Sequence, residues 1–258
     1  MSEVIKLWVL VGGAVLIAVV MFVAVPPVAQ PLAYHDFSDM RGLWGIPNFS
    51  DVVSNAAFVP AGLYGVWVVM GTTDRAAAWS GDARLPLMVF FFSMVLIAPG
   101  SAYYHWAPDN GTLFWDRLPM TVAFMGFSAA VIVDRIHVRP TVVVLVLITI
   151  GVASAVYWHV VDDLRAYILV QFLPMLMIPL VLWMYPQGRY ITWRSVVWVF
   201  VFYALAKWVE HFDAEILELL GGTVSGHTLK HVFAAMAPVG VAVTIQSQGL
   251  GSSLDSSS

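Results

Sequence analysis

Eight stretches of mostly apolar residues, each about 20 residues long, follow one another along this chain. A helix that crosses the hydrocarbon core of a bilayer needs roughly 20 such residues, so each stretch is long enough to span a membrane. The composition agrees, since 60% of the residues are apolar, 11% are charged and the mean hydropathy is +0.83. The predicted spans are residues 4–26, 49–71, 84–106, 112–134, 140–159, 165–185, 192–211 and 227–246.

The spans are expected to be helices, because stretches such as "VFFFSMVLIAPG" lack the strict polar and apolar alternation of barrel strands. The predicted fold class is all-α, a polytopic membrane helical bundle with a seven-helix core preceded by one extra N-terminal transmembrane helix. The expected domains are an N-terminal transmembrane anchor helix (1–30), an outer-side loop (31–47), the seven-helix core (48–246) and a flexible tail or expression remnant (247–258).

Lysine and arginine mark alternate loops, and in membrane proteins these residues favour the cytoplasmic side. The three predicted cytoplasmic loops carry two arginines each, and Lys6 precedes the first span; the pairs are Arg75 and Arg84, Arg135 and Arg139, and Arg189 and Arg194. Both termini are therefore predicted to be cytoplasmic. The difference between the two sides is modest, because five basic residues fall on the outer side: Arg41, Arg117, Arg165, Lys207 and Lys230.

Ionisable residues inside spans are costly and often functional, and several are predicted at one depth near the outer surface. In "SAYYHWAPDNGTLFWD" (101–116), Ser101 and His105 lie one helical turn apart, and Asp116 enters the membrane on the next span. In "SGHTLKHVFAAMA" (225–237), His227 and His231 share one face of the last span. Because the chain has no cysteine, any metal must be held by His, Asp or Glu.

These residues predict a metal centre in which His105, His227 and His231 hold one zinc ion and leave its fourth position open for water. Asp116 is expected to orient or deprotonate that water, and Ser101 to donate to the oxyanion of an attacked carbonyl. Each element also has a structural interpretation. A single His-x-x-x-His pair is weak evidence, Ser101 can bond the preceding turn, and Asp116 can stabilise a helix N-terminus or pair with Arg117.

The sequence resembles the alkaline ceramidase family, within the CREST superfamily of seven-helix membrane zinc hydrolases, over residues 48–246. The resemblance is carried by "NFSDVVSNAAFVPAGLYG", "SAYYHW", "WDRLPM" and "SGHTLKHVFAAMA" in that order. It implies a zinc amidase with His105, His227 and His231 as ligands, Asp116 and Ser101 as catalytic residues, and a structural, hydrogen-bonding role for Asn55. The extra N-terminal span departs from the family, and its role is open.

A calcium site, which some ceramidases of this family have, is doubtful here. The segment before the core keeps Asp36 and Asp39, but Arg41 intrudes and Asn48 stands where the family has a glutamate. Among the other polar residues, Lys207, Glu210, His211 and Asp213 are expected to form an interfacial ion-pair network, with contact to a zinc-binding histidine as a second interpretation. His35 is expected in a loop, His159, Asp162 and Asp163 in a solvated cluster, and tryptophans including Trp158 at the membrane interface.

The predicted function is zinc-dependent intramembrane hydrolysis of the amide bond of ceramide-like lipids, by metal-activated water, toward the outer side. The expected partners are the membrane and a lipid substrate that enters from the bilayer, and no nucleic acid. The alternatives are an ester-cleaving lipid hydrolase, a Ser-His-Asp triad with Ser101 as nucleophile, and a receptor-like lipid sensor with structural zinc. The three histidines would also accept cobalt or nickel, and the sequence leaves the acyl chain and the oligomeric state open.

Overall fold

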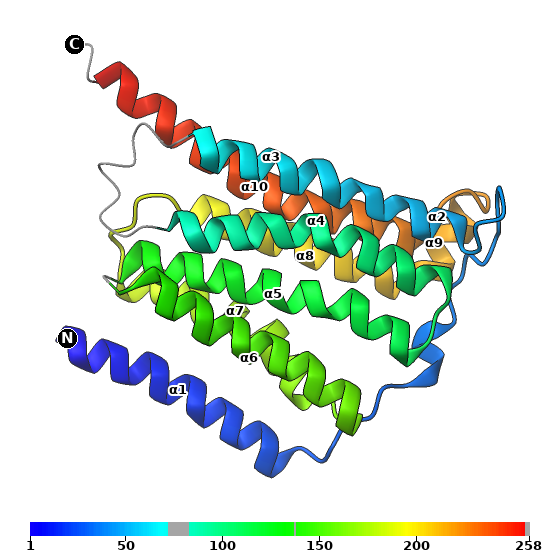
Figure 1. The fold of residues 1–258 in the computed structure, drawn as a ribbon, viewed down its shortest axis with the longest axis horizontal. Coiled ribbons are helices and arrows are strands. Elements are labelled where there is room, and N and C mark those ends of the chain that lie inside the picture. The colour runs from blue at the N-terminus through cyan, green and yellow to red at the C-terminus, as the bar shows by residue number, and fades with distance from the viewer. Residues whose placement is uncertain (72–82, 137, 256–258) are drawn as a thin grey trace.

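The computed structural model describes residues 1–71, 83–136 and 138–255, and every regular element in these ranges is a helix (Figure 1). The expected all-α bundle is therefore confirmed. The elements are α1 (Glu3–Ala24), η1 (Leu32–His35), α2 (Phe49–Ser54), η2 (Asn55–Ala57), α3 (Phe58–Gly71), α4 (Arg84–Trp106), α5 (Asn110–Arg135), α6 (Pro140–Val161), α7 (Arg165–Met184), α8 (Trp193–His211), α9 (Asp213–Leu219) and α10 (Gly226–Asp255).

In the described ranges, seven helices are long and apolar enough to cross a membrane, or eight if α8 and α9 together form one span. The sequence predicted eight spans. The difference lies in α8, which carries Arg194, Lys207 and Glu210 and is followed after one residue by α9, bent by 79°. Since α9 turns away at Phe212, the sixth helix of the core ends at His211, as expected.

The first core span is one predicted segment built as three pieces, α2, η2 and α3. Pro60 has no N–H to donate to the carbonyl of Ala56, which weakens the regular helical ladder at that point. The Asn55 side chain donates to the Asp51 carbonyl at 2.7 Å, so a side chain also competes for the helical acceptors. A 3₁₀ turn at Asn55–Ala57 follows from these two effects.

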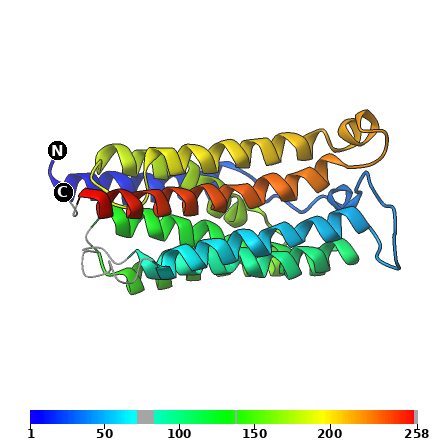
Figure 2. The same cartoon turned by 90° about the horizontal axis from the view of Figure 1, so that it is seen from above.

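The helices lie roughly side by side, and both chain termini lie at the same end of the bundle (Figures 1 and 2). The loop that carries α9 and the loop before α2 lie at the opposite end (Figure 1). The most extensive contacts join α4 to α5 and α8 to α10, while α7 and α8 contact each other at few positions. Gly100 lets α4 approach α5 closely, because a Cβ there would overlap the Trp115 carbonyl. This approach brings Ser101 close to Asp116 on α5.

Helix α1 lies at the edge of the bundle against α7, and Leu10 is its one buried residue (Figure 1). The chain after it is tied to the α6–α7 loop. Arg165 donates from Nη1 to the carbonyls of Phe22 and Val25 at 3.1 and 2.8 Å, and the Leu164 amide donates to Val28 at 2.8 Å.

The expectation of a solvated His159, Asp162 and Asp163 cluster is wrong for Asp163. Its side chain is buried and accepts hydrogen bonds from Arg165, from Tyr157 and from the Val28 amide. The Arg165 guanidinium holds the pKa of the Asp163 carboxyl well below its usual value. Trp158 is also buried within the bundle, and so it does not anchor the membrane interface as predicted.

Candidate metal centre

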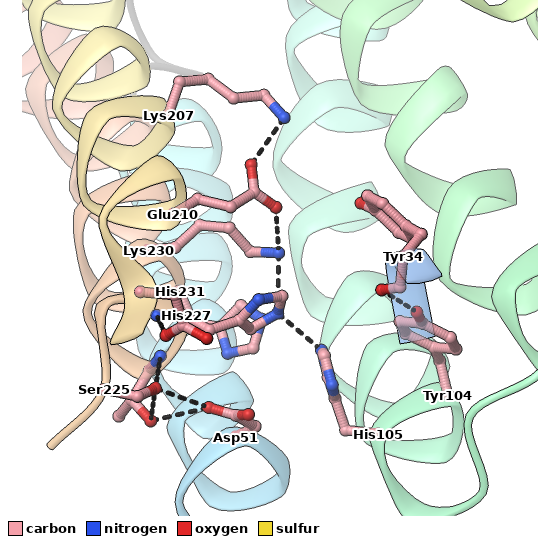
Figure 3. Close-up of polar contacts among 12 residues, drawn as sticks. Tyr34, Asp51, Tyr104, His105, Lys207, Glu210, Ser225, His227, Lys230 and His231 are labelled. Carbon is pink, nitrogen blue, oxygen red and sulfur yellow. Dashed lines mark hydrogen bonds and ion pairs between the residues drawn. The ribbon is translucent and has the colours of Figure 1, made fainter. Parts of the chain in front are cut away.

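Three buried histidines meet near the end of the bundle that lies away from the termini (Figures 1 and 3). His105 comes from the last turn of α4, and His227 and His231 come from the first turns of α10. The spacing of four residues puts both α10 imidazoles on one face. One nitrogen of each ring lies within 4.8 Å of the corresponding atoms of the other two. The structure therefore brings together the three residues that the sequence singled out as metal ligands.

The spacing of one nitrogen pair matches that of two ligands on a tetrahedral metal ion. Nε2 of His227 lies 3.3 Å from Nε2 of His105. Two ligands of a tetrahedral zinc ion, with Zn–N distances of about 2.0–2.1 Å, stand about 3.3 Å apart. Among the described residues, Nε2 of His231 is buried and has no hydrogen-bond partner. A buried lone pair without a donor is unfavourable, so these nitrogens suit a bound cation.

A serine fixes the orientation of His231. Nδ1 of His231 lies 2.7 Å from the Ser54 hydroxyl, which in turn donates to the Asp51 carbonyl at 3.1 Å. Since the Ser54 proton is used on Asp51, the imidazole donates from Nδ1 and keeps the Nε2 lone pair free for a metal. The sequence analysis did not identify Ser54, which lies 177 residues from His231 in the chain.

The backbones of the other two histidines are also held by side chains. The Asn48 amide donates to the His105 carbonyl at 2.8 Å. The Asp213 carboxylate accepts from the His227 amide at 2.6 Å and from the Ser38 amide at 3.1 Å. Asp213 therefore positions the start of α10 by binding the backbone amide of His227. In these two hydrogen bonds its carboxylate contacts backbone amides and not the imidazole that the second interpretation proposed.

The expected ion-pair network is confirmed in part: Lys207 pairs with Glu210, whereas the ion pairs of the described residues include neither His211 nor Asp213, and the network reaches the histidines through Lys230 (Figure 3). Glu210 accepts from Lys207 at 2.7 Å and from Lys230 at 2.8 Å. Nζ of Lys230 also lies 2.8 Å from Nε2 of His227. The lysine and a metal ion would compete for this nitrogen, so metal binding through Nε2 requires the Lys230 ammonium to turn toward Glu210. The sequence analysis gave Lys230 no role at the site.

Ser101 and Asp116 line one cavity with His231. Both side chains are buried, and the Ser101 hydroxyl is a hydrogen-bond partner of the Asp116 carboxyl. The cavity has a volume of about 340 Å³ and continues between the helices along apolar side chains such as Phe90, Phe127 and Ile178. Polar groups thus occupy one end of a pocket that is otherwise suited to hydrocarbon.

The segment between α1 and α2 covers the histidines. The Phe37 ring is buried, with its centroid 4.7 Å from that of His105 and 4.9 Å from that of His227. His35 is not a free loop residue, since it hydrogen-bonds Tyr104 at 2.9 Å and Asn110 at 3.0 Å. Tyr34 from the same segment lines the cavity. The predicted outer loop is therefore a packed cover over the site.

Asp39 and Asn48, two of the residues considered for calcium, have protein partners. Both carboxylate oxygens of Asp39 accept from Arg41 at 2.7 Å, and this ion pair holds the pKa of Asp39 below its usual value. Asn48, at the position of the family glutamate, bonds the His105 carbonyl. Asn55 bonds the Asp51 carbonyl in its own segment, so its structural contact is local and does not link two helices.

Asp51 is the main polar residue that the sequence analysis missed. It is fully buried, and its Oδ1 accepts from Thr228 at 2.7 Å and from Ser225 at 3.4 Å (Figure 3). These bonds tie α2 to the start of α10, where two of the histidines lie. An aspartate within a predicted span was the available signal.

Comparison of the chain with known protein families and with curated proteins found no match. The three buried histidines and the adjoining apolar cavity are therefore the basis for assigning a function.

Proposed function

We propose that this chain is a zinc-dependent intramembrane hydrolase that cleaves the amide bond of ceramide-like lipids. One observation carries the proposal: three buried histidines have converging ring nitrogens, and one of them, His231, lines the polar end of a cavity suited to a lipid chain. The resemblance to the alkaline ceramidase family, carried by the motifs around Ser101, His105, Asp116, His227 and His231, supports the amide over the ester.

In the proposed reaction, each polar residue at the cavity end has a separate role. His105, His227 and His231 would hold zinc, which supplies Lewis acidity and activates water at neutral pH. Asp116 takes a proton from the attacking water and passes it to the leaving amine as the carbon–nitrogen bond breaks. The Ser101 hydroxyl donates a hydrogen bond to the carbonyl oxygen as negative charge develops there.

The surroundings favour a substrate that arrives through the membrane. Phe37 and the rest of its segment cover the histidines, while the cavity is lined by α7 and α8, which contact each other at few positions. Phe172 and Met175 of α7, and Phe200 and Tyr203 of α8, line it there. A lipid moving between these helices would place its acyl chain in the apolar part and its amide near Ser101.

Two alternatives use the same residues differently. A Ser-His-Asp triad needs an imidazole next to the nucleophile, but the hydrogen-bond partner of Ser101 found in the described part of the chain is Asp116. A receptor-like protein with structural zinc would hold the metal without turnover. The experiment that follows separates both alternatives from the hydrolase.

The proposal is tested by measuring metal content and fatty acid release from a fluorescent ceramide for the purified wild type and for His231→Ala. The wild type is expected to hold about one zinc ion per chain and to lose activity on chelation, since three histidines suffice for a catalytic site. The variant is expected to lose both zinc and release. His211→Ala, which removes an exposed histidine of α8, is the matched control and should retain both.

Turnover by a zinc-free His231→Ala protein would contradict metal catalysis and favour Ser101 as the nucleophile. Zinc without release from ceramide or ester lipids would favour the receptor-like protein. Release from ester lipids alone would keep the mechanism and replace the substrate class.

A further inference from the structure

Arg117, on α5 next to Asp116, is enclosed by aromatic rings. Its guanidinium carbon lies 4.2 Å from the centroid of the Trp158 ring, 4.7 Å from that of Tyr167 and 5.5 Å from that of Tyr34. The side chain is buried. A guanidinium keeps its charge in any protein environment, so this cation has to be stabilised where it lies.

The hydrogen bonds of Arg117 leave its charge incompletely matched. Nη2 donates to Oε1 of Gln30 at 2.7 Å, which is a neutral acceptor. Nη1 is buried and has no hydrogen-bond partner in residues 1–71, 83–136 and 138–255. Over the same ranges, Arg41, Arg135 and Arg165 each have a carboxylate within 4 Å, and Arg117 has none.

The aromatic rings do not replace an anion. Ring faces attract a cation, but the in-plane N–H groups of a guanidinium bind best to oxygen lone pairs. A buried donor without an acceptor is destabilising, and a buried charge without a partner more so. The enclosure therefore holds Arg117 in a fixed place while leaving Nη1 for an acceptor that the described residues do not provide.

Arg117 lines the same cavity as Ser101 and Asp116, together with Tyr34 and Tyr167. The cavity end contains three cations, Arg117 and the lysines Lys207 and Lys230, against the carboxylates of Asp116 and Glu210. Both lysines share Glu210, and Asp116 is bonded to Ser101. This balance leaves one positive charge without a negative partner.

We propose that Arg117 anchors an anion-binding subsite that takes a carboxylate or phosphate oxygen of a single-chain lipid, with the hydrocarbon chain in the apolar part of the cavity. The proposal deepens the proposed function, because it places an acidic lipid, as substrate or product, in the same cavity. It does not require zinc or hydrolysis. The guanidinium fork suits both oxygen groups, since it donates two parallel hydrogen bonds.

The test measures binding of hexadecanoate, of a lysophosphatidate and of neutral hexadecanol to purified full-length protein at pH 8. A chelator is present, so that a metal ion cannot hold the anion. The wild type is expected to bind at least one anion about 10- to 100-fold more tightly than the alcohol, the size of a charge-assisted hydrogen bond. The two anions distinguish a carboxylate from a phosphate ligand. Arg117→Gln should lose the preference and keep its affinity for hexadecanol.

Gln30→Glu is a matched variant that keeps Arg117 and gives it a carboxylate at the position of the present 2.7 Å contact. It should lose the preference for anions, because the charge is then balanced internally. It also keeps the test decisive if Arg117→Gln fails to fold. Equal binding of anions and alcohol by the wild type, or an unchanged preference in Gln30→Glu, would overturn the proposal.

The two proposals fail separately. An intact anion preference in a protein that binds no zinc and releases no fatty acid contradicts the hydrolase alone. Zinc-dependent release without any anion preference contradicts the Arg117 subsite alone.

Discussion

At the residue scale, the candidate metal centre depends on small polar groups as much as on its ligands. One ring nitrogen of His231 faces the other two histidines, and the other contacts the Ser54 hydroxyl. That hydroxyl donates its own proton to the Asp51 carbonyl. Groups that orient a metal-binding imidazole commonly change metal affinity by about 10- to 100-fold when they are removed. The strength of the site should therefore be sensitive to a side chain that does not touch the metal.

Ser54→Ala is expected to weaken zinc binding about tenfold, because the His231 ring loses the acceptor that fixes its tautomer and orientation. Competition with a zinc-binding dye, using the purified protein, measures the change. Ser93→Ala is the matched control, since it removes a buried hydroxyl that bonds the Phe90 carbonyl of its own helix at 2.6 Å. Equal zinc affinity in both variants would show that Ser54 does not orient the ligand.

At the element scale, α1 is joined to the core by the chain that follows it more than by its own face. Leu10 is its one buried residue, whereas Arg165 and Asp163 bind the backbone from Phe22 to Val28. The same connection leads to Gln30, which contacts Arg117 at the cavity. The extra helix of this chain is thus linked to the end of the bundle where the candidate site lies.

Asp163→Asn is expected to loosen this connection and speed its amide exchange, because it leaves the Arg165 guanidinium without its carboxylate partner. Arg165 depresses the pKa of Asp163 in the folded protein, so the stabilisation is present above the unfolded pKa of about 3.9 and is lost as the pH falls through the lower folded pKa. The stability difference between wild type and variant should therefore shrink below about pH 4.

Hydrogen exchange of residues 25–31 at pH 7, with thermal unfolding from pH 7 down to pH 3, measures both effects. Asp36→Asn removes a carboxylate from the same connecting segment and serves as the control for charge alone. A difference between wild type and Asp163→Asn that stays constant over this pH range would contradict the ion-pair explanation.

The elements also show how far the sequence predicts the fold. The predicted spans 84–106 and 165–185 correspond to α4 and α7 within one residue, because membrane thickness sets the length of an apolar run. The 3₁₀ turn at Asn55–Ala57 and the bend between α8 and α9 were not predicted, since hydropathy carries no signal for local breaks. The three candidate ligand histidines were predicted from helical spacing, whereas the positions of Phe37, Ser54 and Arg117 depend on tertiary contacts that no spacing encodes.

At the scale of the whole molecule, basic residues at both ends of the bundle pair with carboxylates. Among the outer basic residues, Arg41, Arg165, Lys207 and Lys230 bind Asp39, Asp163 and Glu210. At the opposite end Lys6 and Arg135 likewise pair with Glu3 and Asp134, so the predicted orientation rests on the modest excess of basic residues counted from the sequence. The end that carries both termini is the better candidate for the cytoplasmic side (Figure 1).

The native chain has no cysteine, so single cysteines report on this orientation without further substitution. Ser2→Cys lies at the end with the termini, and Glu218→Cys lies on the exposed surface of α9 at the opposite end (Figure 1). A membrane-impermeant maleimide is expected to label Glu218→Cys in intact cells and to label Ser2→Cys after permeabilisation alone. The unsubstituted chain, which should remain unlabelled, is the control. Labelling of Ser2→Cys in intact cells would contradict this orientation. The histidines and the cavity end with Arg117 would then lie near the cytoplasmic leaflet, and the lipid substrate would have to come from that leaflet.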